Sequence, residues 1–147
     1  MYKTKYMSRP IIIEQKVNAP AGRVWKALTD RNEMNIWYFD IPDFVLKEGA
    51  VFNFYEPGEE RKYHHQAEIL EIIPEKKLKH TWFYPEFSEQ KTTVTWEIFQ
   101  DGENTFVRLT HENVNAFNDL GENFSEKAFT EGWTQIIEHS LKRYLEK

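Results

Sequence analysis

The chain changes its hydrophobic period once, and this change limits the folds that it can adopt. Over residues 44–112, apolar and polar side chains alternate in short runs separated by turn signals such as Pro57-Gly58 and Asp101-Gly102. Over residues 129–145, apolar side chains instead recur at steps of three and four. The first pattern predicts consecutive antiparallel strands, and the second predicts a long amphipathic helix.

A sheet with one large apolar face must bury that face against another element. The C-terminal helix is the one predicted element long enough to cover it. We therefore predict an α+β protein in which a curved antiparallel sheet of about six to seven strands wraps around this helix. Strands are expected at residues 11–17, 51–55, 63–73, 77–84, 93–98 and 107–111.

Two short helices are predicted between the first strand and the rest of the sheet. Pro20 suits the start of a helix, where its missing N–H would have no partner, and the apolar positions Val24 and Leu28 follow it. Asp30, with Glu33 three residues later, forms an acidic version of a capping box, so a second helix is expected to begin there. The predicted order is strand, two short helices, a run of strands and one long helix.

Two local irregularities interrupt this pattern. Isoleucine and leucine residues between positions 69 and 73 break the alternation of the strand at 63–73, which indicates a bulge and leaves the faces of His64 and His65 open. Gly132 lies inside the long helix beside Trp133, at a cost of about 1 kcal/mol relative to alanine. We expect this glycine to allow close approach of another element.

Composition and charge exclude several classes of site and partner. The chain has no cysteine, and therefore no disulfide, thiolate nucleophile or cysteine-based zinc site. Its net charge is −5, with acidic and basic residues interspersed, so no basic stripe suits a nucleic-acid backbone. No metal-ligand spacing, nucleophile motif or phosphate-binding glycine loop occurs. We expect no metal, no cofactor and no catalytic residue.

Length and hydropathy predict one domain. The 147 residues suit a single domain at residues 11–147, preceded by an N-terminal extension at residues 1–10. The apolar run after this extension is too short for a signal-peptide core, and no apolar stretch reaches membrane-spanning length. A cytoplasmic protein without a membrane span is expected.

Five segments carry a resemblance to a known family: Asn18-Ala19-Pro20 with residues 24–30, Trp37, residues 70–82, residues 94–112 and Gly132-Trp133. In this order they resemble the START-like, Bet v 1-like (SRPBCC) superfamily, and most closely its activator of heat-shock protein 90 ATPase homologue-like family. The resemblance implies a helix-grip fold with a deep hydrophobic cavity between the sheet and the C-terminal helix. Superfamily members bind lipids, sterols, polyketides and hormones, and some act as cyclases or aromatases. The eukaryotic namesakes stimulate the chaperone's ATPase, and many small relatives are bacterial, as we expect here.

The residues expected to face this cavity come from the inward positions of the strands, from the apolar stripe of the helix and from the cavity rim. The candidate ligand-binding residues are His80, Trp82, Trp96, His111, Trp133, Phe129, Tyr55, Trp37 and Ile137. A simpler alternative is that the rings fill a solid core and the histidines are hydrogen-bonded within it. Tyr55, Tyr63 and Tyr84 either add hydroxyls to a pocket or cap strand ends, and His139 is expected in solvent.

Three functions are compatible with this sequence. The leading hypothesis is a binder of a small apolar or aromatic ligand, held between the sheet and the C-terminal helix and oriented by His80, His111 and a tyrosine. The second is a chaperone cofactor or other protein-contact module. The third is a cyclase or hydrolase that uses a cavity histidine or tyrosine as an acid or base, although nothing in the sequence identifies such a group.

Overall fold

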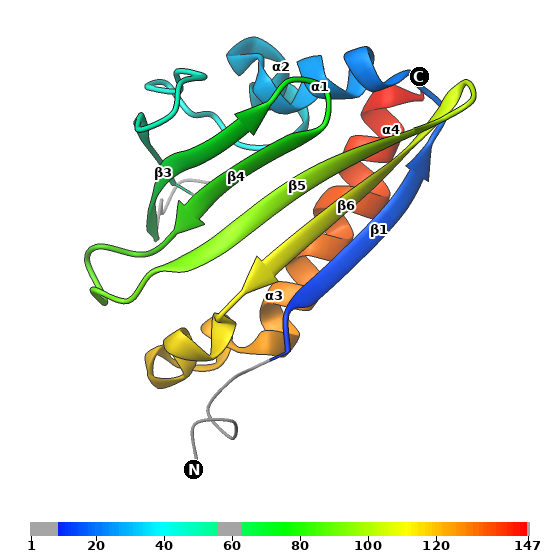
Figure 1. Cartoon of the computed structure of the whole chain (residues 1–147). Helices are drawn as coiled ribbons and strands as arrows, with labels where there is room; N and C mark the ends of the chain where they lie inside the picture. Colours follow the sequence, from blue (N-terminus) through cyan, green and yellow to red (C-terminus); the bar gives the residue numbers. More distant parts are fainter. Residues whose placement is uncertain (1–8, 56–62, 147) are drawn as a thin grey trace.

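We describe the protein from a computed structural model, whose described residues are 9–55 and 63–146 (Figure 1). The predicted turn at Pro57-Gly58 and residues 1–8 of the predicted N-terminal extension lie outside the described residues. Within them, the order of elements is the predicted one: a strand, two short helices, a run of strands and a long C-terminal helix. The α+β helix-grip architecture is thereby confirmed.

The sheet of the described residues has six antiparallel strands in the spatial order β1-β6-β5-β4-β3-β2. They are β1 (Ile11–Val17), β2 (Val51–Tyr55), β3 (His64–Ile73), β4 (Lys77–Trp82), β5 (Thr92–Asp101) and β6 (Asn104–Glu112). Strands β2 to β6 form the predicted meander, and β1 pairs with β6. The predicted irregularity is present, because the register of β3 on β4 shifts between Ile69 and Glu71.

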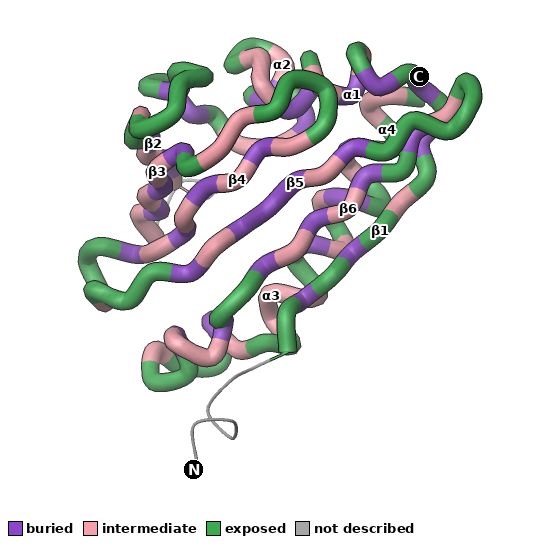
Figure 2. Tube along the Cα trace, in the orientation of Figure 1, coloured by how far each residue is buried: buried purple, intermediate pink, exposed green. Residues whose placement is uncertain are grey.

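Alternation along each strand separates an inner face from an outer face, as the burial colours of Figure 2 show. On β4, for example, Leu78, His80 and Trp82 are buried, whereas the residues between them are half-buried. The structure also assigns the two histidines of β3 whose faces the sequence leaves open. His65 is buried beside Phe54, and His64 turns outward to Asn53.

Helices α1 (Ala21–Thr29) and α2 (Arg31–Trp37) follow β1 and lie at one end of the sheet (Figure 1). The predicted cap at Asp30 is present, because its side chain accepts hydrogen bonds from the backbone N–H groups of Asn32 and Glu33. Glu33 does not complete a capping box, in which its side chain would bond back to the backbone N–H of Asp30. Its carboxylate accepts hydrogen bonds from Arg23 and from the hydroxyl of Tyr144, which joins these helices to the end of the C-terminal helix.

Two 3-10 segments, η2 (Val114–Leu120) and η3 (Glu122–Phe124), lead from β6 into the long helix. This helix is continuous but not uniform: α3 (Glu126–Thr134) passes into a π-helical segment, η4 (Gln135–Leu141), and then into α4 (Lys142–Leu145). The Ser125 side chain caps its start by accepting a hydrogen bond from the backbone N–H of Ala128. The helix runs along β1 and across the sheet (Figure 1), with Trp133, Ile137 and Leu141 fully inward.

The expectation for Gly132 is wrong. No other element approaches this glycine, because a Cβ atom built on it would meet no heavy atom within 4 Å. The residue is exposed and lies in the wall of a pocket, although its neighbour Trp133 is buried. Position 132 therefore borders open space instead of a tight helix contact.

Candidate functional site

The inner face of the sheet carries a continuous cluster of rings, with Trp82 at its centre. The Trp82 ring lies 5.1 Å from Trp133 of the C-terminal helix, 5.2 Å from His65 of β3 and 5.9 Å from His111 of β6, measured between ring centroids. These elements meet here because inward positions of neighbouring strands lie side by side and the helix covers them. The aromatic residues predicted to point inward are thereby brought together.

His111 forms the middle of a buried hydrogen-bonded chain. The indole N–H of Trp133 donates to Nδ1 of His111 over 3.0 Å, and the Thr92 hydroxyl donates to the carbonyl of Trp82 over 2.8 Å. Nε2 of His111 lies 2.8 Å from that hydroxyl oxygen and therefore carries the proton that it donates. Both ring nitrogens of His111 are thus used, and the chain connects the C-terminal helix to three strands.

Both ring nitrogens of His80 are also hydrogen-bonded, on β4, which β5 separates from β6. Its Nδ1 lies 2.8 Å from the carbonyl of Thr81 and must donate, because a carbonyl oxygen only accepts. Its Nε2 accepts from the indole N–H of Trp96 over 3.3 Å. The two histidines that the sequence suggests as ligand-orienting groups are therefore bonded to protein partners through all four ring nitrogens.

His65 differs from these two residues. Its ring is held by the backbone: Nδ1 lies 3.0 Å from the carbonyl of Tyr63, and the ring also hydrogen-bonds the backbone of Phe54. The ring stacks on Phe54, with centroids 4.6 Å apart and planes at 11°. Its side chain belongs to the wall of the pocket described below.

Burial holds these three histidines in the neutral form. Desolvation lowers the pKa of His65 and of His80 to about 4, and that of His111 to about 3, from the ordinary value of 6.5. Each imidazole is therefore uncharged at neutral pH. The inner face consequently presents rings and neutral dipoles, and its histidines contribute no positive charge.

A pocket with a volume of about 500 Å³ opens between the sheet and the first half of the C-terminal helix. The wall from the sheet and from the segments that flank it consists of Phe39, Tyr63, His65, Trp82 and Tyr84. The wall from η3 and the helix consists of Asn123, Phe124, Ala128, Phe129, Gly132, Trp133 and Ile136. Most of these side chains are aromatic, and none of the described lining residues is an acid, a lysine or an arginine.

Two hydrogen bonds order the polar groups of this wall. The indole N–H of Trp82 donates to the Tyr84 hydroxyl over 2.9 Å, and the Asn123 side-chain amide donates to the Tyr63 hydroxyl over 3.0 Å. The second bond connects Tyr63, the residue before β3, to Asn123 of η3, 60 residues away in the chain. The pocket mouth is therefore held by contacts between segments that are distant in sequence.

The structure divides the predicted candidates among three places. Trp82, Phe129 and Trp133 line the pocket. Five others lie elsewhere: His80, Trp96, His111, Ile137 and Trp37 are buried in the core beside it. Trp37 donates its indole N–H to the carbonyl of Ala27 and packs edge-on against Trp96. Tyr55 stacks on His64, which faces away from the inner cluster.

Five further lining residues are not among the predicted candidates: Phe39, Asn123, Phe124, Ala128 and Ile136. Phe39 and Asn123 lie outside regular alternation, so no periodic signal marks them. The sequence does not assign His65 to a face, because the bulge in β3 obscures its parity. A reading of β3 from its start, ahead of the bulge, would have placed His65 on the face of Ala67 and Ile69.

Among residues 9–55 and 63–146, no group of three or more histidine or acidic side chains is arranged to hold a metal ion. No helix in the same residues is long and apolar enough to span a membrane.

Comparison with solved structures gives matches over nearly the whole chain. CalU16 from Micromonospora echinospora is 27% identical, with a TM-score of 0.68 over 92% of this chain and 73% of that protein. An HSP90 activator from Plasmodium falciparum, PFC0360w, is 23% identical, with a TM-score of 0.75 over 94% and 96%. DynU16, a protein in the dynemicin biosynthetic locus, is 18% identical, with a TM-score of 0.75 over 94% of this chain. The chain spans only 47% of the length of DynU16.

Sequence comparison points to the same group. No protein with a curated description matches the chain significantly. The sequence does match the family described as activator of Hsp90 ATPase homolog 1-like protein, and the match extends over residues 18–146. It begins just after β1 and includes both short helices, the rest of the sheet and the C-terminal helix. The chain therefore belongs to the activator of Hsp90 ATPase homolog 1-like family.

Proposed function

We propose that this protein binds a small apolar or aromatic ligand in the pocket between the sheet and the C-terminal helix. One observation carries the proposal: an open pocket of about 500 Å³ is lined mainly by rings from both layers, with no charged side chain among its described lining residues. Small-molecule sites are typically concave, of about 300–1,000 Å³, and apolar with a few placed polar groups. Ligand affinity would come from the burial of apolar surface, at about 25 cal/mol per Å².

The polar groups of the wall support this function because they are few and already ordered. The hydroxyls of Tyr63 and Tyr84 each accept a hydrogen bond from a neighbouring side chain. The pocket therefore does not have to reorganise these groups when a ligand enters, which lowers the entropic cost of binding.

Position 132 offers a direct test. A Gly132→Phe side chain would extend from the pocket wall into open space, and it replaces a poor helix former, so the fold should be kept. We expect native mass spectrometry of the protein purified from its own cells to show a bound small molecule in the wild type and none in Gly132→Phe. Glu131→Phe is the matched control, since Glu131 is the exposed neighbour in the same helix.

The opposite result has a clear meaning. If the wild-type protein carries no small molecule, and a thermal-shift screen of apolar compounds gives no stabilised sample, the ligand-binding proposal is wrong. A ligand that remains bound in Gly132→Phe would place the site outside this pocket.

Family membership favours a second candidate, a protein-contact role in which the chain acts on a heat-shock protein 90 chaperone. The family name and the Plasmodium falciparum HSP90 activator are its support. We expect this role to survive Gly132→Phe, because that substitution changes the pocket and leaves the outer face of the sheet intact. ATPase stimulation of a purified heat-shock protein 90 by wild-type and Gly132→Phe protein tests it, and no stimulation by either protein would exclude it.

A further inference from the structure

The outer face of the sheet is open in the part of the chain that the structure describes. In Figure 1 the C-terminal helix lies behind the sheet, and the opposite side of β1, β6, β5 and β4 is turned towards the viewer without a cover. Large apolar side chains lie on this side: Ile12 is 52% exposed, Phe99 41% and Phe106 40%. Phe99 and Phe106 stand opposite each other in the register, so they form one apolar patch instead of two isolated side chains.

The charges of this face form a row whose signs alternate across four strands. Glu14 of β1, Arg108 of β6, Glu97 of β5 and Lys77 of β4 occupy successive positions in the register. Read from β1, the row begins with an acid, and read from β4, it begins with a base. Two copies of such a row are therefore complementary when one is reversed against the other, because every acid then meets a base.

A two-fold axis that runs parallel to the strands, between β5 and β6, produces this reversal. It places β5 of one copy over β6 of the other, and β4 over β1, and it keeps each row at the same level along the strands. Glu97 then faces the partner's Arg108, and Lys77 faces the partner's Glu14. An axis across the strands would instead set each charge of the row against its own copy, which is unfavourable.

The neighbouring rows fit the same axis. On the side of the β5–β6 turn, Phe99 faces the partner's Phe106, and on the other side of the charge row, Thr95 faces the partner's Thr110. Rings thus meet rings and hydroxyls meet hydroxyls. Two sheets that pack face to face keep their strand directions within about 30° of each other, so these rows stay opposed in the middle of the contact.

We propose that the outer face of β5 and β6 binds a second copy of this chain in a symmetric, sheet-on-sheet dimer. The Glu97–Arg108 pairs and the Phe99–Phe106 contacts hold it together, each occurring twice, as a two-fold interface requires. The sheet curves around the helix, so the contact is confined to its middle strands and lies at the small end of protein interfaces. We expect a Kd of roughly 10–100 μM.

This inference goes beyond the proposed ligand binding and does not depend on it. The pocket opens on the helix side of the sheet, and the dimer contact lies on the other side. Ligand binding and dimerisation can therefore be tested separately.

Charge reversal tests the central pairs. Arg108→Glu and Glu97→Arg each set like charges against each other across the interface, so each should weaken dimerisation by about tenfold or more. Arg143→Glu is the matched control, because Arg143 is exposed on the C-terminal helix, away from this face, and it should keep the wild-type Kd. Sedimentation velocity at a series of protein concentrations measures all three variants and the wild type.

An equimolar mixture of the two variants gives the sharpest result. The two acids at positions 97 and 108 of one variant face the two arginines at the same positions of the other. The mixture should therefore dimerise with a Kd within about threefold of the wild type, although neither variant does so alone. Misfolding of a variant does not produce this recovery. Dimerisation should also weaken at 0.5 M NaCl, because salt screens exposed charges.

Three results would overturn the proposal. A wild-type protein that stays monomeric at about 1 mM, ten times the weakest expected Kd, would show that this face does not bind a second copy. A dimer that persists unchanged in both variants would place the contact on another surface. A mixture that dimerises no better than its components would rule out the axis between β5 and β6.

Discussion

The two faces of strands β5 and β6 provide partners for their polar groups in different ways. On the inner face, Trp96 and His111 are buried, and their polar atoms are bonded to other side chains. On the outer face, Glu97 lies next to Trp96 in the chain and is opposite Arg108 of β6 in the register. Glu97 and Arg108 are accessible to water, whereas the polar atoms of Trp96 and His111 depend on the protein for their hydrogen-bond partners.

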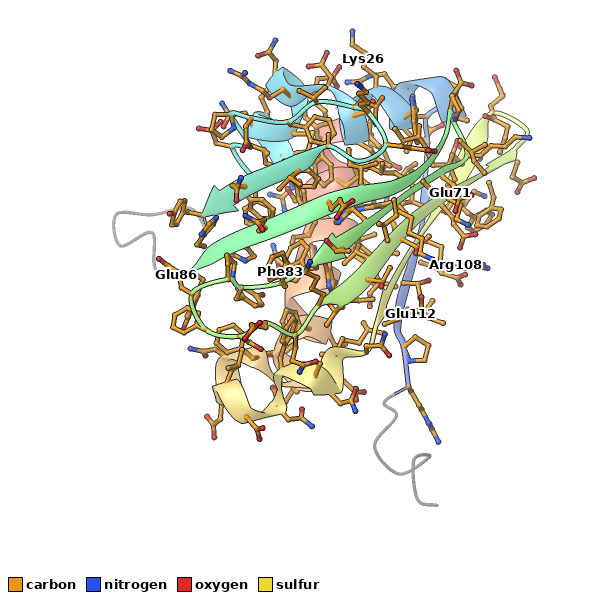
Figure 3. The ribbon with its side chains drawn as sticks, turned by 60° about the vertical axis from the view of Figure 1, so that its left-hand side comes forward. Lys26, Glu71, Phe83, Glu86, Arg108 and Glu112 are labelled. Atoms are coloured by element: carbon orange, nitrogen blue, oxygen red, sulfur yellow. The ribbon has the colours of Figure 1, made fainter. Side chains whose placement is uncertain are left out.

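The outer face extends this pattern into a row of alternating charges. Glu14 of β1, Arg108 of β6, Glu97 of β5 and Lys77 of β4 occupy successive positions across four strands. Arg108, labelled in Figure 3, lies 2.6 Å from Glu14 and 3.7 Å from Glu97. Exposed ion pairs contribute little to stability. A shifted register would place like charges opposite each other, which is unfavourable. We therefore interpret this row of charges as favouring the observed strand register.

The inner face of the sheet therefore contributes most of its stability, whereas the outer face favours the correct strand register. Inner-face groups are costly to leave unpaired, so single changes there should have large effects. Outer-face groups exchange one polar environment for another, so single changes there should have small effects. The four predictions below test this difference, from the largest expected effect to the smallest.

Acidification should affect the inner face most. Unfolded histidines take up protons near pH 6.5, but burial holds the pKa of His65 and His80 at about 4 and that of His111 at about 3 in the folded protein. The unfolded state therefore binds more protons as the pH falls from 6.5 towards 4, and the free energy of unfolding decreases. By pH 4.5, we expect a loss of roughly 2 kcal/mol for each of the three histidines. Urea unfolding at a series of pH values measures it.

Carboxylates also titrate in this range. The histidine contribution is therefore isolated by comparing the slope of the unfolding free energy against pH in the wild type and in a histidine variant. His80→Phe should reduce the dependence of unfolding free energy on pH between 6.5 and 4.5, whatever its effect at neutral pH. His139→Gln should not, because His139 is exposed. An unchanged slope in His80→Phe would contradict the assignment of His80 as a buried neutral group.

Removal of the central ring should produce the next largest effect. Trp82→Ala empties the middle of the inner cluster, and truncations of this kind typically cost about 3–5 kcal/mol. Phe106→Ala is its outer-face counterpart, at a position where 40% of the side chain is exposed, and should cost about 1 kcal/mol or less. Chemical denaturation of both variants measures the difference. Equal losses would show that the two faces do not differ as we describe.

A smaller change can test one hydrogen bond of the buried chain. Trp133→Phe keeps a ring against Trp82 but leaves Nδ1 of His111 without its donor, which should cost about 1–3 kcal/mol. Trp25→Phe is the control, because the Trp25 indole N–H makes no hydrogen bond within the described residues. If both substitutions have the same effect on the free energy of unfolding, the Trp133–His111 bond does not stabilise the fold.

The smallest effect is expected on the outer face. Arg108→Ala removes both ion pairs of the charge row and the guanidinium that lies 4.9 Å from the Phe99 ring centroid. We expect its denaturation midpoint to match the wild type at 0.5 M NaCl, because salt screens such pairs. A large loss of stability that persists at high salt would contradict the solvated role of this row.

Much of the fold follows directly from local patterns. The alternation of Leu78, His80 and Trp82 with lysine and threonine identifies the inner face of β4, because side chains of a strand point to opposite sides in turn. The three- and four-residue steps identify the C-terminal helix and its inward residues, Trp133, Ile137 and Leu141. The spacing of apolar residues does not reveal the π-helical turns in its middle, where backbone hydrogen bonds join residues five apart instead of four.

The candidate site follows from the sequence only in part. Parity correctly brings His80 and His111 to the inner face, but it does not reveal that indole groups already occupy their acceptor nitrogens. It leaves His65 open, because the bulge breaks the alternation on which parity depends. It also cannot separate a ring that lines a pocket, such as Phe129, from one that is packed in the core, such as Trp96.

The sequence by itself determined most of the inward positions in the regular elements, because these depend on spacing along one element and on the cost of exposing apolar surface. The tertiary structure decided which inward residues are bonded to one another and which border open space. Trp133 and His111 are 22 residues apart, and Asn123 and Tyr63 are 60 apart, so their distances depend on how the helix and η3 settle on the sheet. A hydrogen bond requires two atoms within about 3 Å, and no local pattern determines a distance between separate elements.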